Sequence, residues 1–176
     1  MLRKAMVDAS LKDFNEIHAL YDRCFPDDER IPFNHLVDTI SIDRPFYAVY
    51  DDEQLVGLVS IFLIDDLVYL SYLAVEERFR NKGIGSAIVN MVARDYPDTC
   101  IYIDIEMLDE KAENAIERTR RRDFYIRLGF VETGIFYRFY DVDYEILSIH
   151  GIVKKEDLQR LLQKHWGHYA SMARYF

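Results

Sequence analysis

The stretch AVEERFRNKGIGSAIV, residues 74–89, decides the fold of this chain. Its apolar residues recur at helical spacing after Gly83, which predicts that a helix begins there. The loop just before this helix contains three basic residues: Arg78, Arg80 and Lys82. Because a helix N-terminus carries partial positive charge, cations are unfavourable there unless a bound anion lies between them. Free first-turn amides and small glycines suit phosphate oxygens, so the stretch predicts a phosphate-binding loop.

Two well-known phosphate-binding loops fit this stretch poorly. The P-loop signature, which ends in Gly-Lys-Ser or Gly-Lys-Thr, is absent from the chain. The dinucleotide fingerprint needs a third small residue where this chain has Ile88, and residues 76–82 separate Gly83 from the preceding strand. Asp104 does lie where that fingerprint expects an acidic residue. A nucleotide-dependent oxidoreductase therefore stays a competing hypothesis, which tight NAD binding would support.

The composition indicates one folded domain. The chain has 176 residues, of which 50% are hydrophobic and 14% aromatic, enough for a sizeable core. Its net charge of -9 disfavours a nucleic-acid partner, which needs a basic footprint. The longest apolar run, residues 55–64, is too short to cross a membrane. Cys24 and Cys100 are far apart and suggest no disulfide framework, so we expect a cytoplasmic protein. The cysteines and histidines also lack the spacing of metal ligands, so we expect no metal site.

Hydrophobic periodicity predicts a mixed α/β architecture. Ser10 and Asp13 stand in a capping-box arrangement, so we expect the first helix to open at Ser10. Further helices are expected at 32–40, from Ile84 to the residue before Pro97, and at 112–128 and 154–166. Strands are expected at 4–8, 46–50, 55–64, 68–75, 100–106, 130–140 and 144–150. A meander that feeds a crossover helix and a further strand implies a mixed sheet with helices on its faces.

Three motifs together resemble the GNAT family of N-acetyltransferases. RNKGIG, residues 80–85, matches the family's acyl-CoA motif, [RQ]-x-x-G-x-[GA]. YLSYLAV (69–75) is similar to the strand that precedes this motif in the family, and FYIRLGF (124–130) resembles its later Tyr-x-x-x-Gly-Phe signature. CFPDDERIPF (24–33) also resembles a group of uncharacterised bacterial members. The resemblance covers residues 4–150.

The resemblance implies the GNAT fold, a mostly antiparallel twisted sheet of about seven strands with helices on both faces. We therefore expect a single N-acetyltransferase domain over residues 1–176, with its core at 4–150 and a C-terminal helix and aromatic tail at 151–176. Trp166, Tyr169, Tyr175 and Phe176 of this tail are expected either to seal the core or to form a homodimer contact.

The resemblance also implies where acetyl-CoA binds. In the family the pyrophosphate lies on the loop amides, and the backbone of the preceding strand pairs with the pantetheine arm. Asn114 resembles an asparagine that contacts the pantetheine in relatives. The residues implied in binding acetyl-CoA are Leu73, Ala74, Val75, Arg80, Lys82, Gly83, Ile84, Gly85, Ser86 and Asn114. The basic residues Arg118, Arg120, Arg121 and Arg122 are expected to form a solvated helix face or to contact the 3′-phosphate of CoA.

Acetyl transfer to an amine needs a base for the amine and an acid for the departing thiolate. Tyr125 matches the family tyrosine that protonates the thiolate. Glu106, which ends the strand at 100–106, is the first candidate for the base. Asp104 shares its face by alternation, and some relatives use a chain of waters instead, so both remain alternatives.

The sequence therefore predicts an N-acetyltransferase that moves acetyl from acetyl-CoA to a primary amine in a ternary complex. The expected partner is a small-molecule or peptide amine. Asp27, Asp28 and Glu29 are either a solvated loop or an attraction for a cationic acceptor. The alternative is a non-catalytic module of the same fold that binds acyl-CoA as a sensor. Turnover with any amine discriminates between the two.

Overall fold

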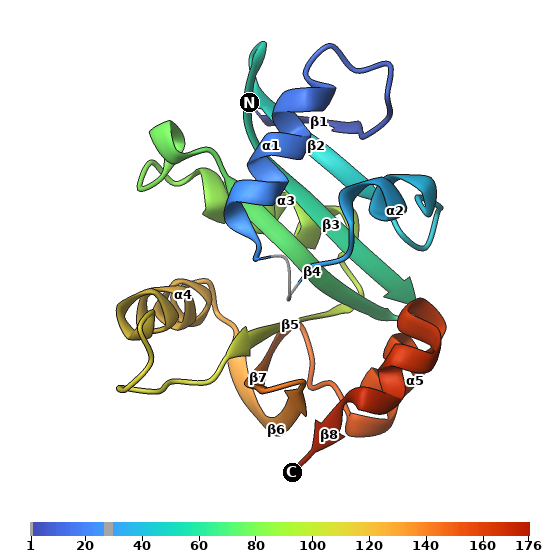
Figure 1. Cartoon of the computed structure of the whole chain (residues 1–176), viewed down its shortest axis with the longest axis vertical. Helices are drawn as coiled ribbons and strands as arrows, with labels where there is room; N and C mark the ends of the chain where they lie inside the picture. The colour runs from blue at the N-terminus through green and yellow to red at the C-terminus, as the bar shows by residue number, and fades with distance from the viewer. Residues whose placement is uncertain (1, 27–29) are drawn as a thin grey trace. The chain divides into compact units, whose positions relative to one another are not determined.

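The computed structural model describes residues 2–26 and 30–176. The chain forms two compact units, one of Met1–Phe62 with Leu70–Pro97 and one of Leu63–Tyr69 with Asp98–Phe176. The strand order is β1-β2-β3-β4-β5-β7-β6-β8 (Figure 1). Strand β4 pairs in parallel with β5, whereas the pairs β1–β2, β2–β3, β5–β7, β6–β7 and β6–β8 are antiparallel. The predicted mixed α/β fold with a mostly antiparallel sheet is confirmed, with eight strands instead of about seven.

The first unit is built on the β-meander that the sequence predicts. Its strands are β1 (Leu2–Met6), β2 (Phe46–Asp51), and most of β3 (Gln54–Ile64) and β4 (Leu67–Val75). Its helices are α1 (Phe14–Cys24), α2 (Phe33–Asp38) and α3 (Ile84–Asp95), with a short 3-10 turn η1 (Glu77–Phe79) before α3. The apolar run of β3 is almost wholly buried, which explains why it does not alternate with polar residues.

Helices cover both faces of the sheet in this unit (Figure 1). The ring of Phe46 on β2 lies 6.2 Å from that of Tyr21 on α1 and 5.9 Å from that of Phe33 on α2. Phe46 is opposite Ser60 in register, so these helices lie on the Ser60 face of β3. A Cβ built on Gly57 would meet Ile88 of α3 at 3.1 Å, and Gly57 points to the other face by alternation. Helix α3 therefore covers the opposite face from α1 and α2.

The second unit carries the later strands and helices. They are β5 (Cys100–Glu106), α4 (Ala115–Arg127), β6 (Val131–Phe139), β7 (Val142–Ile149), α5 (Lys155–Trp166), the 3-10 helix η2 (Gly167–Met172) and β8 (Arg174–Tyr175). Glu145 of β7 accepts from Arg122 of α4 at 3.1 Å. Phe139, which shares the face of its β7 partner Val142, lies 5.0 Å from Trp166 of α5 between ring centroids. Since positions 142 and 145 point to opposite faces, Arg122 of α4 and Trp166 of α5 lie on opposite faces of this part of the sheet.

Two predicted helix starts were wrong, and one strand was missed. Helix α1 begins at Phe14 and not at Ser10, because the Ser10 amide donates to the Asp8 carboxylate at 2.7 Å and forms a turn there. Helix α4 begins at Ala115, after a turn, and not at 112. Strand β8 was not predicted, and it pairs with β6 through Tyr137 and Tyr175.

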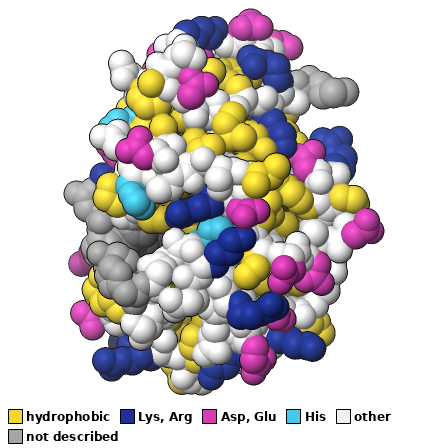
Figure 2. Space-filling model, turned by 90° about the vertical axis from the view of Figure 1, so that its right-hand side faces the viewer, with side chains coloured by type: hydrophobic (Ala, Val, Ile, Leu, Met, Phe, Trp, Pro, Cys, Tyr) yellow, Lys and Arg dark blue, Asp and Glu magenta, His cyan; other side chains and the backbone are white. Residues whose placement is uncertain are grey.

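The aromatic tail contacts its own chain. Trp166 lies against Phe139, and the ring of Phe176 stacks on that of Phe136 at 6.2 Å. The predicted homodimer contact stays a prediction, and the side chain of Tyr169 lies outside the described part of the structure. On the face shown in Figure 2, acidic and basic side chains are interspersed with hydrophobic ones. The negative charge of the chain is therefore not gathered in one region of that face.

Candidate active site

The predicted phosphate-binding loop opens α3 through a left-handed glycine. Gly83 is the N-cap residue, with φ 80° and ψ 0°, and no side chain caps the helix. The first bond of the helical ladder runs from the Ala87 amide to the Gly83 carbonyl at 2.9 Å. The amides of residues 84–86 therefore precede this ladder and have no helical acceptor. A Cβ at Gly83 would meet no atom within 4 Å, so the residue is glycine for its dihedral angle and not for space.

The three cations are exposed around this loop, and one of them ties it to β4. Arg80 donates from Nε to the carbonyl of Val75 at 3.2 Å, and its Nη2 lies 3.6 Å from the sulfur of Cys24. Arg78 and Lys82 lie over the ring of Phe79, at 4.9 Å and 5.6 Å from its centroid. These contacts hold positive charge beside the first turn of α3.

The end of β4 approaches β3 unusually closely. A Cβ on Gly57 would lie 2.5 Å from the carbonyl oxygen of Ala74, a separation that real side chains do not tolerate. The amide of Glu76 donates to the carbonyl of Val56 at 3.0 Å just beyond this point. Gly57 therefore determines the path of the predicted pantetheine-binding segment.

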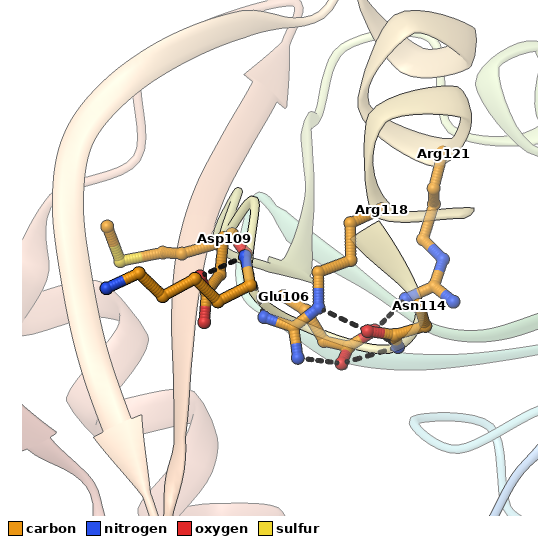
Figure 3. A network of polar contacts seen from close by, with 7 residues as sticks. Glu106, Asp109, Asn114, Arg118 and Arg121 are labelled. Atoms are coloured by element: carbon orange, nitrogen blue, oxygen red, sulfur yellow. Dashed lines mark hydrogen bonds and ion pairs between the residues drawn. The ribbon is translucent and has the colours of Figure 1, made fainter. Parts of the chain in front are cut away.

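Glu106 lies in a buried ion network at the end of β5 (Figure 3). Its side chain is 5% exposed. One carboxylate oxygen lies 2.8 Å from Arg118 Nη2, and the other accepts from Arg121 Nη1 at 2.8 Å. The amide nitrogen of Asn114 lies 3.1 Å and 3.2 Å from the two oxygens. The carboxylate of Glu106, the predicted base, is therefore bonded by three side chains, two from α4 and one from its N-cap residue.

Asn114 and the arginines are engaged within this network. The Oδ1 atom of Asn114 accepts from Arg118 Nε at 2.8 Å, and Arg118 Nη1 also donates to the carbonyl of Met107 at 2.9 Å. Arg122 pairs with Glu132 and Glu145. The predicted solvated arginine face was therefore wrong for Arg118 and Arg122, which are part-buried and ion-paired, whereas Arg120 and Arg121 are exposed.

Tyr125 is packed on the inner side of α4. It is 7% exposed, and its ring lies 4.9 Å from that of Phe124 and 5.3 Å from that of Phe130 between centroids. Burial raises the pKa of Tyr125, and the positive charge of Arg121 one turn earlier opposes that rise. The phenol is therefore protonated over the whole physiological pH range, as a proton donor must be.

Asp104 lies between two tyrosines that the sequence did not single out. Tyr69 of β4 donates to its two carboxylate oxygens at 2.8 Å and 3.0 Å, and Tyr137 of β6 donates to Oδ2 as well. Burial raises the pKa of Asp104, and the hydrogen bonds from Tyr137 and Tyr69 oppose that rise. The alternation of side chains along β5 could have predicted that Asp104 and Tyr102 share one face. The position of Tyr137 beside them depends on how β6 pairs with β7 and β7 with β5, which the sequence does not show.

Neither a metal-ligand cluster nor a membrane-spanning helix occurs among the described residues. No set of three or more His, Cys, Asp or Glu side chains there could hold a metal ion. None of the helices in the described ranges is both long enough and apolar enough to cross a membrane.

Comparison with known proteins identifies the family. The family described as acetyltransferase (GNAT) matches residues 14–130, more than half of the chain. The chain therefore belongs to the GNAT acetyltransferase family, as its motifs predicted. No protein with a curated description matches it.

Solved structures share this fold at low sequence identity. A protein assigned to the GNAT family from Bacteroides thetaiotaomicron is 20% identical, with a TM-score of 0.75 over 96% of this chain and 98% of that one. An aminoglycoside 6′-N-acetyltransferase in complex with coenzyme A is 18% identical, with a TM-score of 0.66 over 84% and 96%. A GNAT family acetyltransferase from Elizabethkingia anophelis with acetyl-CoA bound is 17% identical, with a TM-score of 0.57 over 84% and 97%.

Proposed function

We propose that the chain transfers acetyl from acetyl-CoA to a primary amine by direct attack in a ternary complex. The observation that carries this proposal is the uncapped start of α3 at left-handed Gly83, surrounded by exposed cations, in a chain of the GNAT family. A pyrophosphate supplies the anion that those cations and free amides require. The proposed residues for it are Arg80, Lys82, Gly83, Ile84, Gly85 and Ser86.

We assign the pantetheine arm to the backbone of β4 at Leu73, Ala74 and Val75. The close approach of Ala74 to Gly57 supports this assignment, because a methyl group added at Gly57 would displace this part of β4. Asn114 is the remaining proposed contact. Its side-chain amide already bonds Glu106 and Arg118, so its part in binding would be to fix the start of α4.

Tyr125 is the proposed acid for the thiolate that leaves. Its reference pKa near 10 lies above that of a thiol near 8.5, and burial raises the pKa of Tyr125 further, so donation to the thiolate is uphill, an imbalance that the positive charge of Arg121 reduces. Glu106, predicted as the base, stays untested in that role. Its contacts with Arg118 and Arg121 support a positioning role, in which it holds α4 and thereby Tyr125.

Calorimetric titration with acetyl-CoA tests the phosphate loop. Gly83→Asp adds a negative charge at the helix start and should weaken binding at least about tenfold, a loss of about 1.4 kcal/mol. Gly134→Asp is the matched control, because Gly134 also has a positive φ and no atom within 4 Å of an added Cβ. Equal binding by the two variants would refute the assignment of the loop.

Turnover then separates the enzyme from the alternative sensor. The wild-type protein is assayed with acetyl-CoA and a panel of butylamine, spermidine and kanamycin, and CoA release is recorded. Acetylated product would support the transferase. Tight acetyl-CoA binding without turnover of any amine would support the non-catalytic module.

A further inference from the structure

The strongest unassigned feature is a tyrosine–aspartate cluster in the second unit, formed by Asp104, Tyr69, Tyr102, Tyr137 and Tyr175. The β4–β5 ladder has three pairs and ends at Tyr69 with Tyr102, and Asp104 follows two residues later on the same face. The rings of Tyr69 and Tyr102 stack at 4.8 Å, and the ring of Tyr175 lies 5.7 Å from that of Tyr137. Four aromatic side chains thus surround a single carboxylate.

Two hydroxyl groups of this cluster have no hydrogen-bond partner among the described residues, those of Tyr102 and Tyr175. Tyr102 is 1% exposed. Both hydroxyls lie within electrostatic reach of Asp104, since burial and then the Asp104 charge raise the pKa of Tyr175 to about 12 and raise that of Tyr102 well above its ordinary value. A buried hydroxyl without a partner carries a desolvation cost, so such groups mark where an external polar group binds.

The Asp104 carboxylate retains capacity that Glu106 lacks. A carboxylate has about four lone-pair positions. Asp104 uses them for two neutral tyrosine donors, whereas Glu106 bonds two guanidinium groups and an amide. As a residue, Asp104 keeps partial solvent exposure, whereas the Glu106 side chain is 5% exposed. Of the two carboxylates on this face of β5, Asp104 is the one without a direct cationic partner in the described residues.

We propose that Asp104, presented by Tyr69 and Tyr137, binds the ammonium group of a cationic primary amine and takes its proton before acetyl transfer. This inference rests on the proposed function and names both its base and its acceptor class. An ammonium group has three N–H donors, and the hydroxyl oxygens of the cluster supply acceptors beyond Asp104.

The proton and electron balance is complete without another reactant. Asp104 takes a proton from R–NH3⁺ and leaves R–NH2, whose lone pair attacks the thioester carbonyl. The C–N bond forms and the C–S bond breaks. Tyr125 gives its proton to the thiolate, and the second proton lost by the nitrogen replaces the proton on Tyr125. Asp104 then releases its proton to solvent.

The test compares Asp104→Asn with Asp98→Asn, the same change on the exposed turn before β5. Asp104→Asn should reduce kcat/KM for butylamine at pH 7 by about 10²–10⁴-fold, the usual contribution of a general base. The loss should shrink at high pH, where more of the amine is already neutral. Acetyl-CoA affinity by calorimetry should stay within twofold of wild type, and Asp98→Asn should leave both quantities unchanged.

Tyr137→Phe tests the positioning role separately. The charged and titratable groups around Asp104 are Tyr69 of β4, Tyr102 of β5, Tyr137 of β6, Tyr175 of β8, and Arg121 and Tyr125 of α4. Since the hydrogen bond from Tyr137 lowers the pKa of Asp104, its removal should move the acidic limb of the kcat/KM profile to higher pH. A purely structural role would reduce activity without moving that limb.

The outcomes separate this inference from the function on which it rests. Acetyl transfer that survives in Asp104→Asn with an unchanged pH profile would overturn the inference and leave the transferase intact. If no amine is turned over, calorimetric titration of the CoA-loaded protein with butylamine decides. Binding that Asp104→Asn abolishes supports the ammonium site, whereas no binding to wild type means that the orphan hydroxyls hold an ordered water only, and overturns it.

Discussion

The Glu106 network makes a stability prediction that can be worked from its contacts. The change is Glu106→Gln, which keeps the shape of the side chain and removes its charge. Arg118 and Arg121 then face a neutral amide, and one of its two ends is a donor that repels them. We expect the free energy of unfolding to fall because α4 loses its main ionic attachment to β5.

The magnitude follows from the exposure of each partner. A hydrogen bond to a charged group contributes about 1.5–3 kcal/mol when it is shielded, and the Arg118 side chain is 16% exposed. The Arg121 side chain is 45% exposed, so solvent screening limits its pair to under about 1 kcal/mol. The expected loss is about 2–4 kcal/mol, which lowers Tm by about 5–15 °C for a chain of this length.

Thermal and urea unfolding followed by circular dichroism measure this loss. Glu117→Gln is the matched control, since Glu117 is exposed on the first turn of the same helix. Its cost should stay below about 1 kcal/mol, the value of a helix-dipole interaction. A Glu106→Gln variant no less stable than Glu117→Gln would refute the network. A double-mutant cycle with Arg118→Met should also show a non-additive coupling of about 1 kcal/mol or more.

Three further predictions follow from single positions. Gly57→Ala places a methyl group 2.5 Å from the Ala74 carbonyl, so it should lower the free energy of unfolding by about 1–3 kcal/mol and weaken acetyl-CoA binding in calorimetry. Unchanged binding would contradict the proposed pantetheine path. Gly83→Ala has open space but a φ of 80°, so it should cost only about 1–2 kcal/mol in thermal unfolding, and a larger loss would mean that packing matters there. Burial raises the pKa of Asp104 above its ordinary value of 3.8, so between the two pKa values the folded state binds more protons than the unfolded one, and stability should fall as pH rises from 3.8 through the folded pKa. Asp104→Asn should therefore gain stability relative to wild type as pH rises from 4 to 8 in Tm measurements, and a constant difference would disprove this.

Local patterns in the chain were sufficient for most of the elements. The predicted strand at 100–106 coincides with β5, and the predicted start at Gly83 is the N-cap of α3. These predictions succeed because side-chain periodicity and glycine conformations act over a few residues. The start of α1 was missed because Asp8 competes locally for Ser10, and β8 was missed because a two-residue strand carries no periodicity.

The phosphate loop could be predicted because all its parts are adjacent in the sequence. The carboxylates of β5 could not be told apart in the same way. Glu106 and Asp104 stand two residues apart on one face, and only the tertiary structure gives one of them arginines and the other tyrosines. Helix α4 begins after a turn, and the length of this turn determines which arginines reach β5. The pattern of charged residues along the helix does not indicate that length.

The sequence by itself determined the fold class, the family motifs and the start of α3 at Gly83, since each depends on residues close in the chain. The tertiary structure alone decided the surroundings of Asp104. Tyr137 reaches it from β6, where the register shifts between Glu132 and Phe136. This irregularity shifts the pairing by two residues, so the local pattern of β6 does not state which positions of β7 and β5 lie beside Tyr137. The partner of a buried carboxylate is set by strand pairing across distant segments, which no local pattern records.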